Sequence, residues 1–293
     1  MTFSIIIPTF NRPEKVARAI RSCFNQTYSE AFEVIVVNDG GRSIEVSSLP
    51  VKNNVSLSII DINNSGVSQA RNIGIKHASG AWICLLDDDD MFLPNHLNVL
   101  QITILKLQES KINWISTDSI QIFPSKTSIK SSKKYGALTF RDAIKWDAIT
   151  TNTSCFRREA SGEFPIKEKY LEDFEHRLDI IQNGGYFRVP CITSVIDSTE
   201  NSATNGEHDG DLPKTYLRRY EEIFSKYPQY RKYKNRRMAP WRWRYISRSA
   251  PDLSMPEFLL ETSKVLIHLR HVKCVTILDL ISVIAKKISG KQY

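Results

Sequence analysis

Blocks of apolar residues alternate with blocks of helical periodicity along the first 90 residues. A helical pattern runs from about Pro13 to Phe24, with its proline at the permissive first turn, and another one covers residues 66–80. Four segments of strand length built on apolar runs lie at residues 3–8, 32–39, 55–62 and 81–90, and the last of them ends in four aspartates. Strands that are apolar throughout and alternate with helices predict an α/β fold with a mostly parallel, Rossmann-like sheet flanked by helices on both faces.

Polar side chains gather where three of these strands end. They lie at residues 9–12, 38–41 and 87–90. In an open parallel sheet, ligands bind in the crevice beyond the carboxyl ends of the strands. The three polar segments are therefore expected to converge at one edge of the sheet and to form a binding site there.

The remainder of the chain divides into two parts. Further strands and helices are predicted up to about residue 200, including a helix around Tyr170 to Gln182 that Gly184 and Gly185 end. A loop rich in Ser, Asn, Gly and Asp follows at residues 197–211. We therefore predict an α/β domain over residues 1–210 and a helical, basic extension over residues 211–293.

The formal net charge of +8 is concentrated in that extension. Residues 214–250 contain 12 lysines and arginines against two glutamates, a local net charge of +10, and aromatic residues are interleaved with these cations. Such a segment can lie on an anionic membrane with its aromatics at headgroup level, bind RNA, or form a helical appendage with a solvated basic face. The membrane surface is the favoured partner and nucleic acid the least favoured.

Cysteine usage and hydropathy bear on the compartment. The five cysteines include no C-x-x-C pair, which argues against a disulfide framework and a cysteine zinc site. No apolar run approaches the roughly 18 residues of a membrane span, and the start of the chain lacks a secretion-signal pattern. These features predict a cytoplasmic protein, at most peripheral on the inner face of the cell membrane. A last helix over about residues 272–288 is apolar around most of its circumference, so we expect it to pack on the domain, on a second copy in a homo-oligomer, or on lipid.

Four consecutive aspartates, Asp87 to Asp90, follow the apolar residues of the strand that begins at residue 81. Adjacent carboxylates raise one another's pKa unless a cation neutralises them. Their hard oxygen atoms favour Mg²⁺ or Mn²⁺, which proteins hold with one or two carboxylates plus substrate phosphates. A solvated acidic turn is the alternative, and an EF-hand is excluded because its Gly and its distal Glu are missing.

Four segments form a combined pattern: IIIPTFNR at 5–12, VIVVNDGG at 34–41, GVSQARNIGIKHASGAWICLLDDDD at 66–90 and YLEDFEHRL at 170–178. In these segments the chain resembles glycosyltransferase family 2, a family of inverting nucleotide-sugar transferases with the GT-A fold. The resemblance implies transfer of a hexosyl or N-acetylhexosaminyl group from a UDP-sugar donor to a saccharide or lipid-linked saccharide acceptor. It also implies a place in the synthesis of a cell-envelope polysaccharide, such as a capsule or lipopolysaccharide.

The resemblance further implies roles for single residues on the donor side. Asp89 would be the direct ligand of a Mn²⁺ or Mg²⁺ ion that bridges the diphosphate, with Asp87 on the ribose or the same metal. Asp88 occupies the middle of this D-x-D signature. The other nucleotide-binding residues implied are Pro8, Thr9, Asn11 and Arg12 along the base and ribose, Asp39 on a uracil-type ring, and Arg71 on the base or phosphates.

On the acceptor side, the resemblance makes Asp173 the general base that takes a proton from the acceptor hydroxyl, with Glu172 as the second candidate. Without the upstream motifs, acids that favour a helix N-terminus would explain this pair. Arg177 would pair with Asp173 or contact phosphates. His208, in the polar loop, is a candidate late metal ligand, against the alternative of an ordinary exposed histidine.

Three other function classes match part of the pattern. A phosphatase of the haloacid dehalogenase type also places D-x-D after a strand, but Met91 stands where it needs Thr or Val. A sugar-phosphate nucleotidylyltransferase needs a glycine-rich turn after the first strand, and residues 8–15 contain no glycine. A non-enzymatic nucleic-acid-binding protein would need only the basic extension.

Overall fold

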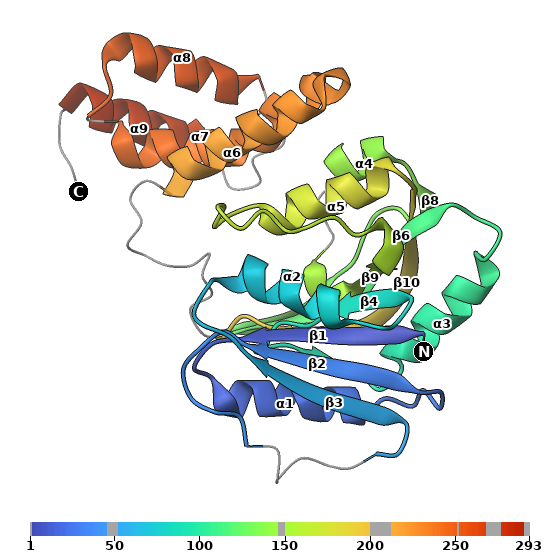
Figure 1. Ribbon diagram of the computed structural model, residues 1–293. Helices are drawn as coiled ribbons and strands as arrows, with labels where there is room; N and C mark the ends of the chain where they lie inside the picture. Colours follow the sequence, from blue (N-terminus) through green and yellow to red (C-terminus); the bar gives the residue numbers. More distant parts are fainter. Residues whose placement is uncertain are drawn as a thin grey trace. The chain divides into compact units, whose positions relative to one another are not determined.

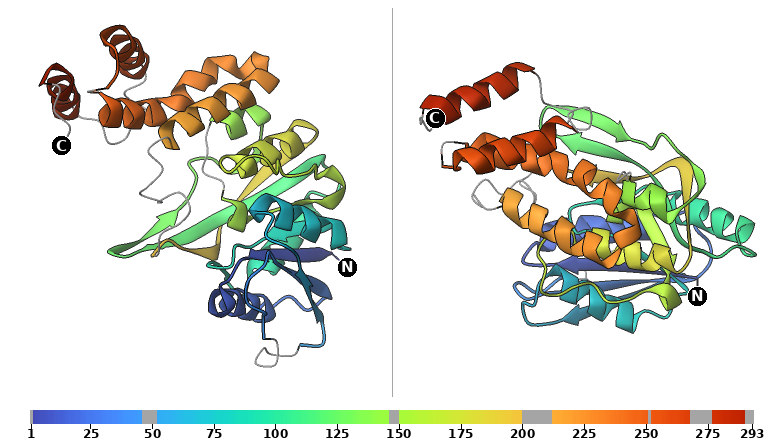
Figure 2. Two further views of the ribbon diagram at one scale, coloured as in Figure 1. Left: turned by 60° about the vertical axis from the view of Figure 1, so that its left-hand side comes forward. Right: turned by 90° about the horizontal axis from the view of Figure 1, so that it is seen from above.

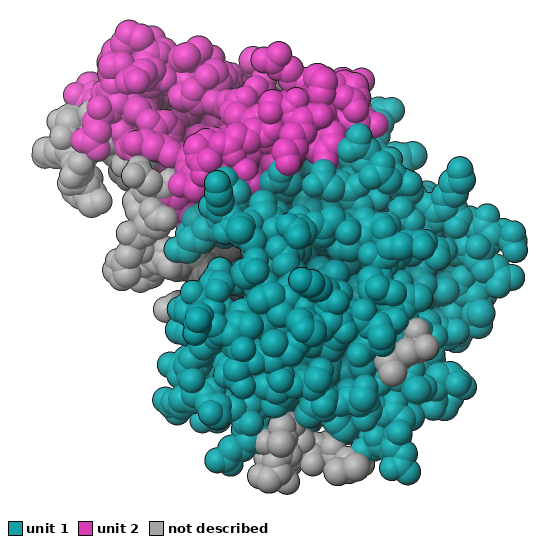
Figure 3. Space-filling model, viewed as in Figure 1, with its two compact units in different colours: residues 1–205 teal, residues 206–293 magenta. Residues whose placement is uncertain are grey.

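The computed structural model describes residues 2–45, 52–145, 150–199, 212–250, 252–267 and 277–289 (Figure 1). The chain forms two compact units, Met1–Asn205 and Gly206–Tyr293 (Figure 3). Within the described ranges, no helix has both the length and the apolar character needed to cross a bilayer.

The first half of the sheet in the N-terminal unit is parallel. Its strands lie in the order β3 (Val55–Asp61), β2 (Phe32–Asn38), β1 (Phe3–Thr9) and β4 (Trp82–Leu85). In register, Thr9 at the end of β1 lies opposite Asn38 at the end of β2. The predicted polar segments therefore meet at one edge of the sheet.

Helices α1 (Pro13–Phe24) and α2 (Val67–His77) cover opposite faces of these strands (Figure 1). Side chains alternate along β1, so Ile5 and Ile7 pack with Ile20 of α1 in the main core. Ile6 points the other way, and its side chain would clash with a Cβ placed on Gly74 of α2. Gly74 thus lets α2 lie directly on the sheet.

The second half of the sheet is mixed. Next to β4 lies the antiparallel strand β9 (Ser154–Arg157), followed by β6 (Ile112–Phe123), β10 (Gly185–Asp197) and β5 (Met91–Phe92). Strands β7 (Lys126–Lys130) and β8 (Gly136–Leu138) pair with β6 and β10. The other elements are α3 (His96–Lys106), α4 (Phe140–Lys145), α5 (Glu172–Gln182) and the 3-10 turns η1 (Thr151–Thr153) and η2 (Arg158–Ala160). The predicted α/β class is confirmed: the first half of the sheet is parallel, and in the second half β6 and β10 also pair in parallel.

The C-terminal unit is helical. It comprises α6 (Leu212–Lys226), η3 (Pro228–Tyr233), α7 (Lys234–Ser249), α8 (Met255–Leu266) and α9 (Ile277–Ser289). Helices α6 and α7 lie side by side (Figure 2), and the ring of Tyr216 stacks on that of Trp241 with centroids 3.6 Å apart. A small core that includes Phe258, Val265 and Val283 joins α8 and α9 to α7.

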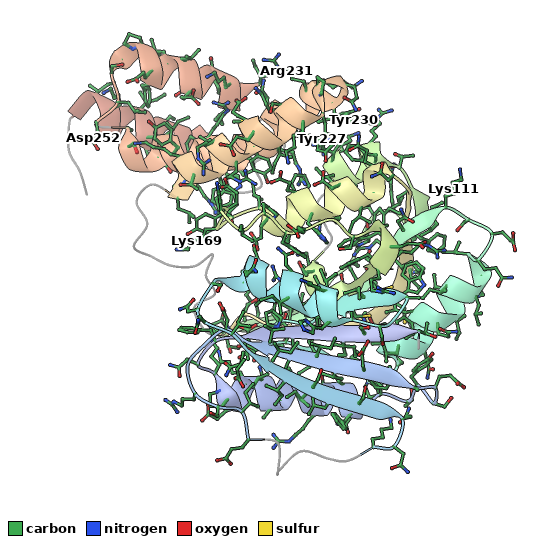
Figure 4. All side chains as sticks on the ribbon, in the orientation of Figure 1. Lys111, Lys169, Tyr227, Tyr230, Arg231 and Asp252 are labelled. Atoms are coloured by element: carbon green, nitrogen blue, oxygen red, sulfur yellow. The ribbon has the colours of Figure 1, made fainter. Side chains whose placement is uncertain are left out.

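Many aromatic side chains of the basic segment lie inside this unit. Tyr216, Tyr220 and Phe224 are buried and are spaced four residues apart, so they form one face of α6. Tyr230 and Arg231 lie in the turn between α6 and α7 (Figure 4). In the fold, the aromatic residues of α6 thus form a buried face, while the cations of the segment divide into exposed ones such as Arg218 and buried ones such as Arg219 and Arg242.

Candidate active site

The loop after β1 meets the run of four aspartates at the edge of the sheet. The Thr9 hydroxyl donates a hydrogen bond of 2.7 Å to one carboxylate oxygen of Asp88, and Arg12 donates to the other at 3.1 Å. Asp88 is buried, and this burial raises the pKa of its carboxyl although Thr9 and Arg12 act in the opposite direction. The Asp88 carboxylate is thus engaged within the protein, where it joins the β1 loop to the acid run.

Asp39, at the end of β2, organises the turn that precedes α2. Its two carboxylate oxygens accept hydrogen bonds from the backbone N–H groups of Ser65 and Gly66, each 2.7 Å long. Gly66 has a φ of +89°, a left-handed conformation that favours glycine. The structure therefore places Asp39 at the predicted edge, next to the start of α2.

Two residues other than glycine have left-handed backbone conformations among the described residues, and both lie at the site. Asn11, with a φ of 54°, is in the loop between β1 and α1, and Leu171, with a φ of 61°, immediately precedes Glu172. A Cβ on Gly41 would lie 2.9 Å from that of Asn11, so the two loops approach closely. Such conformations cost about 1–3 kcal/mol and concentrate at functional sites.

The four aspartates differ in what surrounds them. The side chains of Asp87 and Asp89 retain 33% and 28% exposure. Asp90 is only 3% exposed and accepts hydrogen bonds from the backbone N–H of Asp197 and the side-chain amide of Asn152. Asp87 and Asp89 are therefore the two acids of the run that can reach a ligand.

The acid run is electrostatically strained, as its sequence predicts. Burial, followed by the charges of Asp87 and Asp88, raises the pKa of Asp89. Burial and the charge of Asp87 also raise the pKa of Asp90 to about 8. A divalent cation would relieve this repulsion, and carboxylate oxygens are suitable ligands for Mg²⁺ or Mn²⁺.

Among the described residues, no three His, Cys, Asp or Glu side chains converge as a ready-made metal cage. Two partly exposed carboxylates are instead the donor set expected for an ion that completes its coordination with substrate phosphates and water. The residues present therefore fit a metal that enters together with a diphosphate. His208 lies outside the described residues.

Arg71 connects the acid run to the acidic pair on α5. Its guanidinium is buried, and its terminal nitrogens lie 2.9 Å from Oδ1 of Asp87 and 3.2 Å from Oε1 of Glu172. It also lies over the ring of Phe164, 5.3 Å from the centroid. The sequence predicts that Arg71 contacts the nucleotide, and the structure places its guanidinium between the two acidic groups of the site.

Glu172 and Asp173 occupy the first turn of α5, where acids are stabilised by the helix dipole. Burial, together with the charge of Asp173, raises the pKa of Glu172 to about 7 although Arg71 opposes the shift. Asp173 accepts a hydrogen bond of 3.2 Å from the Thr151 hydroxyl. The buried guanidinium of Arg177 lies over the ring of Phe174.

Arg18 and Asp197 border the other side of the acid run. Arg18 donates a hydrogen bond of 2.6 Å to the backbone oxygen of Asp89 and forms an ion pair of 3.0 Å with Asp197. A cavity of about 220 Å³ opens beside them, lined by Glu14, Lys15, Arg18, Asp197 and Thr199. No motif in the sequence pointed to this cavity, because its lining comes from α1 and the distant end of β10.

Comparisons with known proteins agree with this arrangement. The family model described as "Glycosyl transferase family 2" matches residues 4–161. The "uncharacterized glycosyltransferase YwdF" of Bacillus subtilis (strain 168) is 32% identical over 235 residues, which cover 76% of this chain and 84% of that relative.

Two solved structures show the same fold. That of S. aureus TarS 1-349 in complex with UDP-GlcNAc has 18% identity and a TM-score of 0.64, over 99% of this chain and 89% of that chain. The mannosyltransferase PcManGT from Pyrobaculum calidifontis in complex with GDP-Man and Mn²⁺ has 15% identity and a TM-score of 0.55, over 99% of this chain and 88% of that chain.

A central sheet of this topology, with acidic groups at the ends of its strands, defines a GT-A type nucleotide-sugar glycosyltransferase. The match over more than half of the chain makes the assignment specific: the protein belongs to glycosyl transferase family 2. The predicted family and fold class are thereby confirmed.

Proposed function

We propose that this protein is a metal-dependent, inverting glycosyltransferase that uses a UDP-sugar donor and a saccharide acceptor. The observation that carries the proposal is the pair of acidic groups joined by Arg71, since each group keeps partly exposed carboxylates. Asp89 and Asp87 are the partly exposed acids of the run, and Arg71 forms its ion pair in the α5 pair with Glu172, the neighbour of Asp173.

On the donor side, Asp89 and Asp87 are proposed to hold Mn²⁺ or Mg²⁺. When bound, the ion neutralises the charge that grows on the diphosphate leaving group. Asp88 and Asp90 keep their internal partners and orient the two ligands. The Mn²⁺ of the mannosyltransferase neighbour and the UDP-GlcNAc of the TarS structure support this assignment.

On the acceptor side, Asp173 is proposed as the general base. It removes the proton of the acceptor hydroxyl while that oxygen attacks the anomeric carbon on the face opposite the diphosphate, and the configuration inverts in this single displacement. Glu172 is held by Arg71 and serves the site as a fixed neighbour of Asp173.

The direct test is calorimetric titration with UDP-GlcNAc, UDP-glucose and GDP-mannose, with and without Mn²⁺, followed by assays of donor turnover. We expect Mn²⁺ to strengthen binding of a UDP-sugar and to support its slow hydrolysis. Absence of binding and turnover for every donor would contradict the proposal.

For the acceptor and the pathway, we propose a lipid-linked saccharide of the cell envelope, met at an anionic membrane surface. The support comes from the helical unit. Residues 214–250 carry a net charge of +10, and the apolar side chains of Leu259 on α8 and Ile288 on α9 are 59% and 76% exposed. Cationic residues near apolar side chains suit the headgroup region of anionic lipids.

This membrane proposal predicts that the full chain sediments with vesicles containing phosphatidylglycerol and not with vesicles of phosphatidylcholine alone. The double variant Leu259→Gln with Ile288→Gln should reduce the bound fraction several-fold. If vesicles fail to bind and the protein is instead an oligomer that the double variant dissociates, the exposed apolar residues form a subunit contact.

A further inference from the structure

A single turn of 3-10 helix, η1, lies between the two acidic groups of the site. Its residues Thr151, Asn152 and Thr153 are all buried. The turn leads directly into β9, which is hydrogen-bonded between β4 and β6. The Thr117 hydroxyl of β6 also donates to the carbonyl oxygen of Thr153 at 3.2 Å. The turn is therefore fixed to the centre of the sheet.

Asn152 holds the acid run through both ends of its side-chain amide. Its carbonyl oxygen accepts from the backbone N–H of Asp87 at 2.9 Å, and its amino group donates to the Asp87 carboxylate at 3.0 Å. The same amino group donates to Asp90. Only this orientation of the amide satisfies all three partners, because carboxylates require a donor and a backbone N–H requires an acceptor.

Thr151, the preceding residue, reaches the other acidic group. Its hydroxyl donates to Oδ2 of Asp173 at 3.2 Å. Because Arg71 bridges Asp87 and Glu172, the contacts close into a ring around the site. One side of that ring is an ion-paired arginine, and the other side is a neutral turn of two adjacent residues.

We propose that Thr151 and Asn152 are positioning residues that fix the metal-binding acids relative to the general base. The inference rests on the proposed function, since it assigns the donor and the acceptor hydroxyl to these two acidic groups. Reacting atoms must be held about 3–3.5 Å apart, and a misplacement of about 1 Å can cost a hundredfold in rate. A turn that bonds to both groups sets this distance within one rigid element.

Thr153, in the same turn, offers a matched control for Thr151. Thr153, two residues after Thr151, has a buried hydroxyl that donates to the backbone oxygen of Thr150 at 2.9 Å and not to an acid. The variants Thr151→Val and Thr153→Val each remove one buried hydroxyl from the same turn at nearly constant volume. A merely structural role predicts similar effects of both changes on thermal stability and on turnover.

The experiment measures donor turnover as UDP release, and binding of UDP by calorimetry with and without Mn²⁺, for wild type and variants. In Thr151→Val we expect kcat to fall about tenfold to a hundredfold, with Mn²⁺-dependent UDP binding within about twofold of wild type. Thr151→Ser keeps the hydroxyl and should recover most of the lost turnover. Thr153→Val should keep kcat within about threefold of wild type.

Asn152→Ala tests the contact of the turn with the acid run. Loss of the amide should weaken Mn²⁺-dependent UDP binding at least about tenfold, while binding of UDP without metal changes little. A normal kcat in Thr151→Val, or an equal loss of kcat in Thr151→Val and Thr153→Val, would overturn the positioning role while leaving the proposed function intact. A wild-type protein that neither binds UDP with Mn²⁺ nor turns over a donor would instead contradict the proposed function.

Discussion

The two acidic groups of the site resemble each other in sequence and differ in how the fold uses them. In the run Asp87 to Asp90, two carboxylates are buried against internal partners, and Asp87 and Asp89 remain partly exposed beside Arg71 and Arg12. In the pair on α5, Glu172 is tied to Arg71, while Asp173 accepts hydrogen bonds from the Thr151 hydroxyl and from the backbone N–H of Phe174. In each group, then, part of the negative charge maintains the structure and part is left for chemistry.

The difference between the groups lies in the environment of the remaining acids. Asp89 lies beside other aspartates, so a cation is the natural partner of its carboxylate. Asp173 lies near the start of a helix and next to a neighbour that Arg71 compensates. Repulsion among carboxylates thus favours metal binding in the run, whereas at the pair Arg71 offsets part of the negative charge beside Asp173.

The largest effect is expected for Asp173→Asn. An amide cannot accept the acceptor proton, so turnover should fall by about 10² to 10⁴-fold, the usual contribution of a positioned base. Calorimetric binding of UDP and Mn²⁺ should stay within about twofold of wild type. Near-normal turnover in this variant would assign the base to another residue, and Glu172→Gln should then show the loss instead.

The second prediction compares Mn²⁺-dependent UDP binding in variants of two neighbouring aspartates of the run. Asp89→Asn should weaken Mn²⁺-dependent UDP binding by at least about a hundredfold, because it removes a direct ligand. Asp90→Asn changes the next carboxyl in the run, a buried group whose raised pKa of about 8 leaves it largely neutral, and should leave this binding within a few-fold of wild type. If the two variants behaved in the opposite way, Asp90 would be the ligand.

The third prediction tests whether Arg71 stabilises the fold by bridging Asp87 and Glu172. Arg71→Met leaves Glu172 and Asp87 without their buried cation and should lower the free energy of unfolding in urea by about 3 kcal/mol. Arg12→Met also removes a cation beside an aspartate, but Arg12 is 45% exposed, so its loss should cost less than about 1 kcal/mol. Equal losses would show that Arg71 is not a structural bridge.

The smallest effect is a pH dependence of stability. Burial raises the pKa of Glu172 from its ordinary value of 4.5 to about 7, so the folded state binds this proton more tightly than the unfolded state does. The stability that this group contributes is complete below about pH 4.5 and is lost as the pH rises through 7. Metal-free Glu172→Gln should therefore gain about 2 kcal/mol relative to wild type between pH 5 and pH 8, measured by urea unfolding. A constant difference across this range would contradict the assigned shift.

Much of the fold could be predicted because local patterns determine it. The apolar runs that became β1, β2 and β4 end in polar residues, and parallel pairing brings those ends together without further information. The burial of Tyr216, Tyr220 and Phe224 was also encoded, in a four-residue spacing that the basic residues around them obscure.

The contacts of Asn152 could not be predicted in the same way. Sixty-five residues separate it from Asp87, and the two meet only because β9 enters the sheet antiparallel to β4. Nothing in the short polar segment at residues 150–154 distinguishes it from an ordinary turn. The contact between Arg71 and Glu172 could not be predicted for the same reason, since 101 residues separate them.

The most direct test of this account is a crystal structure of the protein with UDP and Mn²⁺. We predict a metal ion on Asp89 and Asp87 that also contacts the diphosphate, with Asp88 still bonded to Thr9 and Asp90 still bonded to Asn152. A diphosphate bound elsewhere, or a metal ion held by Asp88 or Asp90, would contradict the division of the acid run into structural and ligand-binding carboxylates.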